Sequence, residues 1–265
     1  MRRRSFILLA ITTFAGFPLL ARADITLGEA GTFAVLAGST VTNTGLSVID
    51  GGDVGVSPGT AITGFGPGTV LPPFTFHSAD GTAGLAQADL LTAYNAATLL
   101  APTQILTGTD LGGLTLTPGV YSFATSAQLT GTLTLNDMGD PNAQFVFQIG
   151  TALTTASDAA VVTIDGGANP GSTVFWQVGS SATLGTNTAF EGHILAYASI
   201  TLNTGASMID GSALAMYGAV TLDTNRITNH VRSVPEPTSL ALSLIGGTLL
   251  GLSALRKRLR QRRSR

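Results

Sequence analysis

Three near-copies of one short sequence motif indicate the fold: Ser181-Ala-Thr-Leu-Gly-Thr186, Ser199-Ile-Thr-Leu-Asn-Thr204 and Ala219-Val-Thr-Leu-Asp-Thr224. Their central threonines, at positions 183, 201 and 221, are 18 and then 20 residues apart. A repeat of this length, rich in β-branched residues, Gly and Asn, is typical of a solenoid in which each repeat forms one coil. Stacked coils place equivalent residues about 4.8 Å apart, which predicts a ladder of threonines on one flat wall.

Alternation within these segments separates an inner from an outer face. The aliphatic and small residues predicted to point inward are Ala182, Leu184, Ile200, Leu202, Val220 and Leu222. Those predicted to point outward are Ser181, Thr183, Ser199, Thr201 and Thr221. The outer face would then carry hydroxyl and methyl groups and almost no charge.

The start of the body repeats the same kind of coil. Residues 33–37 match residues 194–198 in character, and residues 39–45 echo residues 199–205. Here Thr40 and Thr42 would point outward around Val41. We therefore expect the first strands to stack beside later coils, giving a solenoid that is continuous in space but discontinuous in sequence.

One segment changes period, from two residues to three and four. Its apolar residues predict an amphipathic helix over about 83–100: Ala83, Ala86, Leu90, Ala93, Ala97 and Leu100. Asp80 is placed to cap its start and Pro102 to end it. We expect the helix to pack against residues 174–178, 194–197 and 213–216, with Trp176 in that core rather than serving as a sugar platform.

The N-terminal end has the pattern of a targeting signal rather than of a folded segment. Arg2 to Arg4 form a basic start, residues 6–20 are apolar, and Ala21-Arg-Ala23 offers a small-x-small cleavage pattern. This predicts a secretory signal peptide over residues 1–23. The alternative, a membrane anchor, is disfavoured by a short run that Gly16 and Pro18 interrupt.

The C-terminal end combines Pro235, Glu236 and Pro237 with an uncharged stretch over 238–255 and a basic tail to Arg265. An 18-residue helix spans about 27 Å, roughly a membrane's hydrocarbon thickness. This order resembles the PEP-CTERM sorting signal of Gram-negative bacteria, which implies a sorting protease and the membrane as partners of residues 234–265. The alternative is a plain C-terminal anchor, and either leaves the body outside the cell.

Charge is distributed unevenly along the chain. Of the 13 basic residues, four lie in the first 23 positions and seven follow Leu255, so residues 24–233 keep only Arg226 and Arg232 against 14 acidic residues. A body this acidic has no patch to neutralise phosphates, which excludes nucleic acid as an expected partner. The chain has no cysteine, so packing and backbone ladders must hold the body together without disulfides.

Catalytic and metal-binding patterns are weak. The three histidines, His77, His193 and His230, are scattered, and no nucleophile elbow or metalloprotease helix is present. Glu191 and His193 could share one strand face, but solvated strand residues explain them better. The glycine-rich stretches 50–58 and 62–68 have neither the order of a calcium repeat nor the context of a dinucleotide site, so we expect turns. We expect no enzyme activity, cofactor or metal.

Many ordered segments between residues 24 and 230 resemble the microbial ice-binding protein family. They include Leu27-Gly-Glu-Ala-Gly-Thr-Phe-Ala-Val-Leu-Ala37, Gly52-Asp-Val-Gly-Val-Ser-Pro58, Leu90-Leu-Thr-Ala-Tyr94 and Phe145-Val-Phe-Gln148. The resemblance implies that residues 24–233 form a right-handed discontinuous β-solenoid, triangular in cross-section, with one long α-helix along a face. It also implies an exported protein whose partner is the surface of an ice crystal.

The resemblance implies that the ice-binding face lies on the regular sheet that follows the helix-packed wall. That sheet is expected to hold Thr151, Ser181, Thr183, Ser199, Thr201 and Thr221, with Thr40, Thr42, Thr154, Thr186, Thr204 and Thr224 as weaker candidates. Asp223 departs from this pattern because it adds a hydrated charge where the first repeat has Gly185. The alternative function is a non-enzymatic cell-surface or biofilm-matrix adhesive protein that binds exopolysaccharide.

Overall fold

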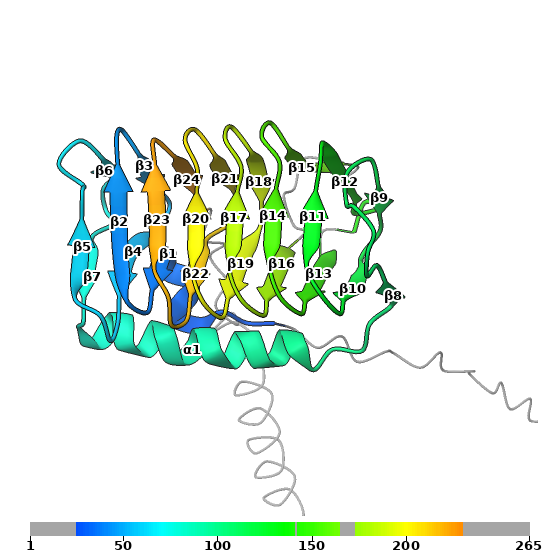
Figure 1. The fold of residues 1–265 in the computed structure, drawn as a ribbon. Coiled ribbons are helices and arrows are strands. Elements are labelled where there is room, and N and C mark those ends of the chain that lie inside the picture. The colour runs from blue at the N-terminus through cyan, green and yellow to red at the C-terminus, as the bar shows by residue number, and fades with distance from the viewer. Residues whose placement is uncertain (1–24, 141, 165–172, 230–265) are drawn as a thin grey trace, which may run out of the picture.

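The computed structural model describes residues 25–140, 142–164 and 173–229. They form a β-solenoid with three parallel sheets as its walls and one long helix along one wall (Figure 1). The predicted fold class is confirmed. The three sheets, the helix and both core clusters of the described residues lie within residues 25–229.

Each wall is a sheet whose strands come from successive coils. The helix-covered sheet has the order β7 (Phe76–Ser78), β4 (Asp53–Val56), β1 (Phe33–Ala37), β22 (Ala213–Ala215), β19 (His193–Ala196), β16 (Thr173–Val178), β13 (Gln144–Ile149), β10 (Gly119–Phe123) and β8 (Gln104–Ile105). The threonine sheet has the order β11 (Ala127–Leu129), β14 (Leu153–Thr155), β17 (Ala182–Leu184), β20 (Ile200–Leu202), β23 (Val220–Asp223), β2 (Thr40–Thr44) and β5 (Ala61–Thr63). The third sheet has the order β6 (Thr69–Val70), β3 (Val48–Asp50), β24 (Arg226–Thr228), β21 (Ser207–Ile209), β18 (Ala189–Glu191), β15 (Ala160–Ile164), β12 (Thr132–Asn136) and β9 (Thr115–Leu116).

The solenoid is discontinuous in sequence, as predicted. The first coil, β1 to β3, stacks on the last coil, β22 to β24, in all three sheets. In the threonine sheet, for example, Val41 pairs with Val220 and Thr42 with Thr221. The chain then forms the end coil with β4 to β6, and the helix carries it along the whole length to the opposite end (Figure 1).

The interior is filled by the inward residues of all three sheets. Those predicted from the repeats, Ala182, Leu184, Ile200, Leu202, Val220 and Leu222, are all buried in one core cluster. Burial of aliphatic side chains stabilises by roughly 25 cal/mol per Å² of apolar surface. This burial holds the coils in a single register, since a slip by one residue would turn every inner side chain outward.

The predicted helix exists as α1 (Gly81–Thr98), two residues earlier than expected at each end. It starts early because the Asp80 carboxylate accepts a hydrogen bond from the Ala83 N–H, which is the role expected of an N-cap. Its buried stripe is Ala83, Ala86, Leu90, Ala93 and Ala97. These small residues let α1 lie close to the sheet, where they pack with Phe175, Leu195, Leu214 and a 3-10 turn at Gly28–Thr32.

The expectation that Trp176 faces the helix was wrong. The residue lies inside the solenoid, stacked on Phe147 at 3.9 Å between ring centroids, and not against the helix. Its neighbours in sequence, Phe175 and Gln177, point the other way, and Phe175 contacts the helix core. The reason is strand alternation: Val174, Trp176 and Val178 share the inner face. The prediction that residues 174–178, 194–197 and 213–216 form the helix-covered wall is confirmed.

Gly51 explains why a glycine-rich stretch follows the first coil. Its φ is +87°, and a Cβ there would lie 1.9 Å from the backbone oxygen of Asn229. Gly64 likewise has a φ of +80° next to the Asn43 carbonyl. The glycine-rich stretches 50–58 and 62–68 therefore turn the chain where two coils approach closely, as predicted.

The signal peptide (1–23), the sorting motif (Pro235, Glu236 and Pro237) and the segment 238–255 lie outside the described residues. Among the described residues, no helix combines the length and apolarity that a membrane span requires. The two ends of the chain therefore remain predictions from sequence.

Candidate functional site

One rank of outward side chains crosses the whole threonine sheet. Seven strands place their central residues in register: Gln128, Thr154, Thr183, Thr201, Thr221, Thr42 and Thr63. We call these seven residues the central rank. The side chains are half-buried or exposed, and each lies one strand spacing of about 4.8 Å from the next. Six consecutive threonines thus form a straight row.

The structure assigns the register of β14 differently from the prediction. Leu153 pairs with Ala182 and Thr154 with Thr183, so Thr154 belongs to the central rank. Thr151 lies at the corner that precedes β14, outside the strand, and the expectation for it was wrong. Burial decides this register because Leu153 fills the core, whereas aligning the two Thr-x-x-Thr patterns would have turned it outward.

Thr186, Thr204 and Thr224 lie in the turns that follow the strands and not on the flat wall. Thr224 has a φ of +54°, a conformation uncommon for a β-branched residue. All three are exposed. They form the edge of the face toward the third sheet.

A second row runs beside the central rank at the start of the strands. It holds Ser181, Ser199, Ala219, Thr40 and Ala61. The Ser181 Oγ accepts from the Ser199 N–H, and the Ser199 Oγ accepts from the Ala219 N–H, both at 3.2 Å. These hydroxyls are held in place by the next coil, which fixes their positions along the row.

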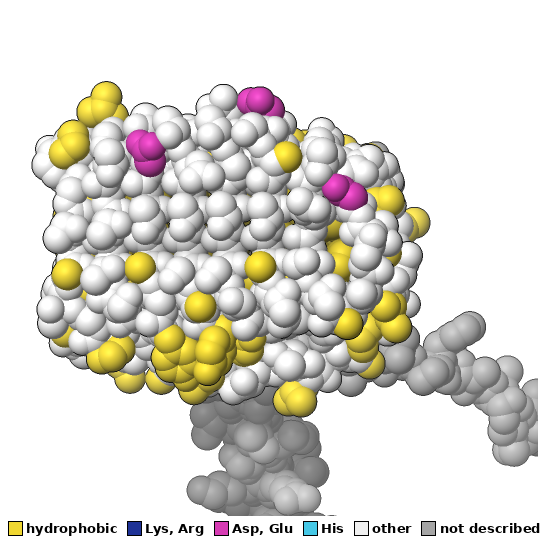
Figure 2. Space-filling model, in the orientation of Figure 1, with side chains coloured by type: hydrophobic (Ala, Val, Ile, Leu, Met, Phe, Trp, Pro, Cys, Tyr) yellow, Lys and Arg dark blue, Asp and Glu magenta, His cyan; other side chains and the backbone are white. Residues whose placement is uncertain are grey.

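The acidic side chain of Asp223 lies on the side of the central rank opposite to the second row, at the end of β23. Its carboxylate accepts hydrogen bonds from the hydroxyls of Thr204 and Thr224. Two donors from neighbouring turns thus hold this charge at the edge of the sheet. Figure 2 shows rows without acidic or basic side chains across the middle of this face, with acidic side chains above them and at their right-hand end.

Thr63 and Gln128, the two ends of the central rank, were missed by sequence reasoning. The signal for Thr63 was present, since Ala61-Ile-Thr63 has the pattern of Ala219-Val-Thr221. It was hidden by the glycine-rich turn that follows. Gln128 has no such pattern, and only the pairing of β11 with β14 places it.

The other two walls are different. The third sheet exposes a mixture of charge and large apolar groups: Arg226 pairs with Asp50 at 3.7 Å, and Val162, Ile164 and Ile209 are 40–50 % exposed. The helix-covered sheet is occupied by α1. The threonine sheet is therefore the wall that is both open and uniform.

Polar clusters outside the threonine sheet have structural roles. The His77 Nδ1 lies 2.7 Å from the Asp80 carboxylate, and hydrogen bonds from the Ala83 N–H and from His77 lower the pKa of Asp80. Glu191 and His193 contact different partners, Thr163 and Ser212. His230 lies outside the described residues. Within the described part of the chain, no group of three acidic or histidine side chains is arranged for a metal.

A family model described as Ice-binding-like matches residues 35–228. The chain belongs to the ice-binding-like family. It is 52 % identical over 271 residues to an ice-binding protein from Nostoc sp. strain HG1, with 98 % of each chain covered. The resemblance to the microbial ice-binding protein family, inferred above from the sequence, is thus confirmed.

Solved structures of ice-binding proteins support the same family assignment. A crystal structure of an ice-binding protein from the Antarctic ascomycete Antarctomyces psychrotrophicus shares 42 % identity and a TM-score of 0.71, covering 77 % of this chain and 97 % of that one. Another, of an ice-binding protein from an Antarctic biological consortium, shares 42 % identity and a TM-score of 0.70, covering 84 % and 96 %.

Proposed function

We propose that this protein binds ice through the central rank of the threonine sheet. The observation that carries the proposal is the unbroken register of Thr154, Thr183, Thr201, Thr221, Thr42 and Thr63. The ice-binding names of its relatives support it.

The physical argument concerns order and hydration. Threonine is stiff at χ1 and carries a methyl beside a hydroxyl, so a row of threonines loses little side-chain freedom on meeting a rigid partner. The strand spacing of about 4.8 Å is close to a repeat of the water lattice. Many weak contacts made at once by a preordered array then add up, as in multivalent binding.

Charge supports the same face. A charged group holds its own hydration shell, which competes with the ordered water of a crystal surface. No residue of the central rank is charged, and Asp223 is held at the margin by two hydroxyls. The face thus presents its hydroxyls and methyls without a fixed charge between them.

The test is thermal hysteresis and ice recrystallisation inhibition on purified residues 24–233. Thr201→Tyr, at the centre of the rank, should lower thermal hysteresis by about tenfold because a ring standing above the row prevents flat contact. The matched control is Thr134→Tyr on β12, where a half-buried outward threonine occupies the third sheet. Equal activity of the two variants would place ice binding on another surface.

We further propose that the protein is exported and non-catalytic, that residues 1–23 are removed, and that the segment 234–265 is read by a sorting protease at the membrane. The sequence pattern of both ends supports this. Mass spectrometry of the protein recovered outside the cell tests it: the mature chain should begin near Asp24 and end near Pro235.

A second candidate function is adhesion to exopolysaccharide at the cell surface. The observation that favours it is a pair of tyrosine rings, Tyr197 and Tyr217, that stand exposed in contact with each other beside the helix.

A further inference from the structure

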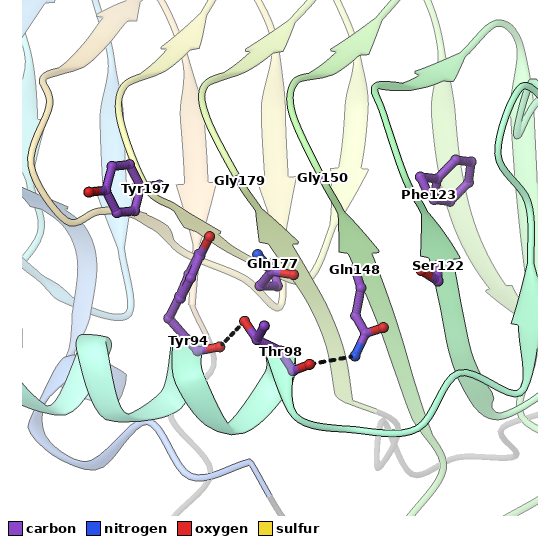
Figure 3. A pocket seen from close by; sticks show the side chains of 9 residues that line it. All are labelled: Tyr94, Thr98, Ser122, Phe123, Gln148, Gly150, Gln177, Gly179 and Tyr197. Atoms are coloured by element: carbon purple, nitrogen blue, oxygen red, sulfur yellow. Dashed lines mark hydrogen bonds between the residues drawn. The ribbon is translucent and has the colours of Figure 1, made fainter.

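A groove of about 450 Å³ lies between the C-terminal half of α1 and the helix-covered sheet. Figure 3 shows its lining, with Tyr94 and Thr98 from the helix facing strands β10, β13 and β16. It lies at the corner where the helix-covered sheet meets the threonine sheet, since Gly150, Gly179 and Tyr197 directly follow β13, β16 and β19. None of its lining residues belongs to the central rank.

The floor of the groove is an uncharged polar ladder. Ser122, Gln148 and Gln177 pair in register on three neighbouring strands. The same outward rank continues as Leu195, Leu214 and Leu36 beneath the helix. The rank changes from leucine to amide and hydroxyl groups where the groove begins, so the floor presents hydrogen-bonding groups about 4.8 Å apart.

The amide of Gln148 is held in a fixed orientation. Its Nε2 donates to the carbonyls of Ala97 and Leu100, both at 2.8 Å, and so closes the C-terminal end of the helix. Its Oε1 points away from the helix end (Figure 3). An orientated amide of this kind is a preorganised acceptor for a hydroxyl group.

Aromatic rings form one side of the groove. The Tyr94 and Tyr197 rings lie 6.4 Å apart, and Tyr197 contacts Tyr217 at 5.0 Å. Tyr197 is 49 % exposed and Tyr217 58 % exposed, and neither belongs to a core cluster. Burial raises the pKa of Tyr94, whose ring packs against the helix core cluster, whereas the Tyr197 and Tyr217 rings remain open.

We propose that this groove binds a neutral saccharide chain. A flat tyrosine ring packs against the C–H face of a pyranose, while its hydroxyl and the neighbouring amides match the hydroxyls of the sugar. None of the lining residues is charged. An acidic polysaccharide would instead meet a body with 14 acidic residues between positions 24 and 233, which repels it.

This site would serve the adhesive function, and it does not depend on ice binding. An open groove, unlike an enclosed pocket, admits an internal stretch of a polymer. The expected partner is therefore a neutral polysaccharide bound along its length and not a free sugar bound at one end.

Affinity electrophoresis of residues 24–233 in gels containing dextran, mixed-linkage β-glucan, galactomannan or alginate tests the proposal. At least one neutral polymer should retard the protein, and alginate should not. Tyr197→Ala should weaken that retardation by about tenfold. Ser122→Tyr, which fills the floor, should do the same from the opposite end of the groove.

The matched control is Ile209→Ala, which removes a side chain that is 50 % exposed on the third sheet and should leave retardation unchanged. Thermal melts confirm that each variant is folded. Thr201→Tyr should lose thermal hysteresis yet keep polysaccharide binding, whereas Tyr197→Ala should show the reverse. The proposal is overturned if no neutral polymer retards the protein, if alginate alone does, or if both groove variants bind as the unmodified protein does.

Discussion

At the scale of single residues, the threonine sheet separates two kinds of polar side chain. Outward threonines in the central rank leave their hydroxyls facing solvent, with one long contact of 3.4 Å between Thr42 and Thr221. The buried threonines Thr155 and Thr188 are instead paired: the Thr155 hydroxyl lies 2.8 Å from that of Thr188 and accepts from the Gly185 N–H. The surface hydroxyls are thus free for a partner, while those inside stabilise the fold.

Asp223 gives a prediction about charge on the proposed ice face. Asp223→Asn should raise thermal hysteresis because it removes a hydrated charge on the same strand as Thr221. Asn203→Asp, on the neighbouring coil, should lower it for the same reason. Thermal hysteresis of the two variants is measured at the same pH, so that each serves as the control for the other. A change of the same sign in both variants would contradict a charge effect.

Glu191 gives a prediction about pH. Burial raises its pKa above the ordinary value of 4.5, Asp210 adds to the rise, and hydrogen bonds from Thr163 act against it. Because the folded protein keeps this proton to a higher pH than the unfolded chain does, the free energy of unfolding falls as pH rises from 4.5 through the folded-state pKa.

Glu191→Gln should therefore flatten the pH profile of stability above 4.5, while keeping an acceptor for Thr163. Urea unfolding at a series of pH values measures the difference. Asp80, whose pKa is lowered, acts in the opposite direction and only at lower pH, since its contribution is lost as pH falls below 3.8. A variant whose pH profile matches that of the unmodified protein would show that Glu191 titrates normally.

At the scale of elements, the helix depends on small residues. Ala86 is fully buried between α1 and the sheet, whereas Ala88 on the same helix is exposed. The close approach of the axis to the wall leaves no room for a longer side chain at position 86. Helix propensity is nearly equal for alanine and leucine, so the two positions differ in packing alone.

Ala86→Leu should lower the free energy of unfolding by about 1–3 kcal/mol through overpacking. Ala88→Leu should change it by less than about 0.5 kcal/mol, as expected at an exposed position. Urea denaturation measures both. Similar values for the two variants would mean that the helix can move away from the sheet without cost.

At the scale of the whole molecule, the last coil in sequence is an inner coil in space. Strands β22 to β24 are paired on one side with β19 to β21 and on the other with β1 to β3. A solenoid whose chain order matches its stacking can lose its final repeat and keep the rest. This one cannot, because removing the last coil separates the first coil from its partner.

A chain ending at Ile209 should therefore lose cooperative folding and not merely become shorter. Circular dichroism melts of residues 24–209 and 24–233 test this. A cooperative melt and retained thermal hysteresis in the shorter chain would show that the first coil can re-pair directly with β19 to β21.

The sequence by itself determined the features that depend on local periodicity. Alternation in β17, β20 and β23 showed which side chains face inward, the three-and-four spacing located α1 within two residues, and the echo of residues 194–205 in residues 33–45 indicated a discontinuous solenoid. These patterns are readable because covalent geometry sets the direction of each side chain relative to its neighbours.

Only the tertiary structure decided what depends on pairing between distant strands. It placed Thr154 and not Thr151 in the central rank, turned Trp176 into the solenoid, and brought Tyr94 beside Tyr197 to form a groove. The physical reason is that register between coils follows from how the whole core is filled. No single segment contains that information, because each strand is positioned by side chains that come from other coils.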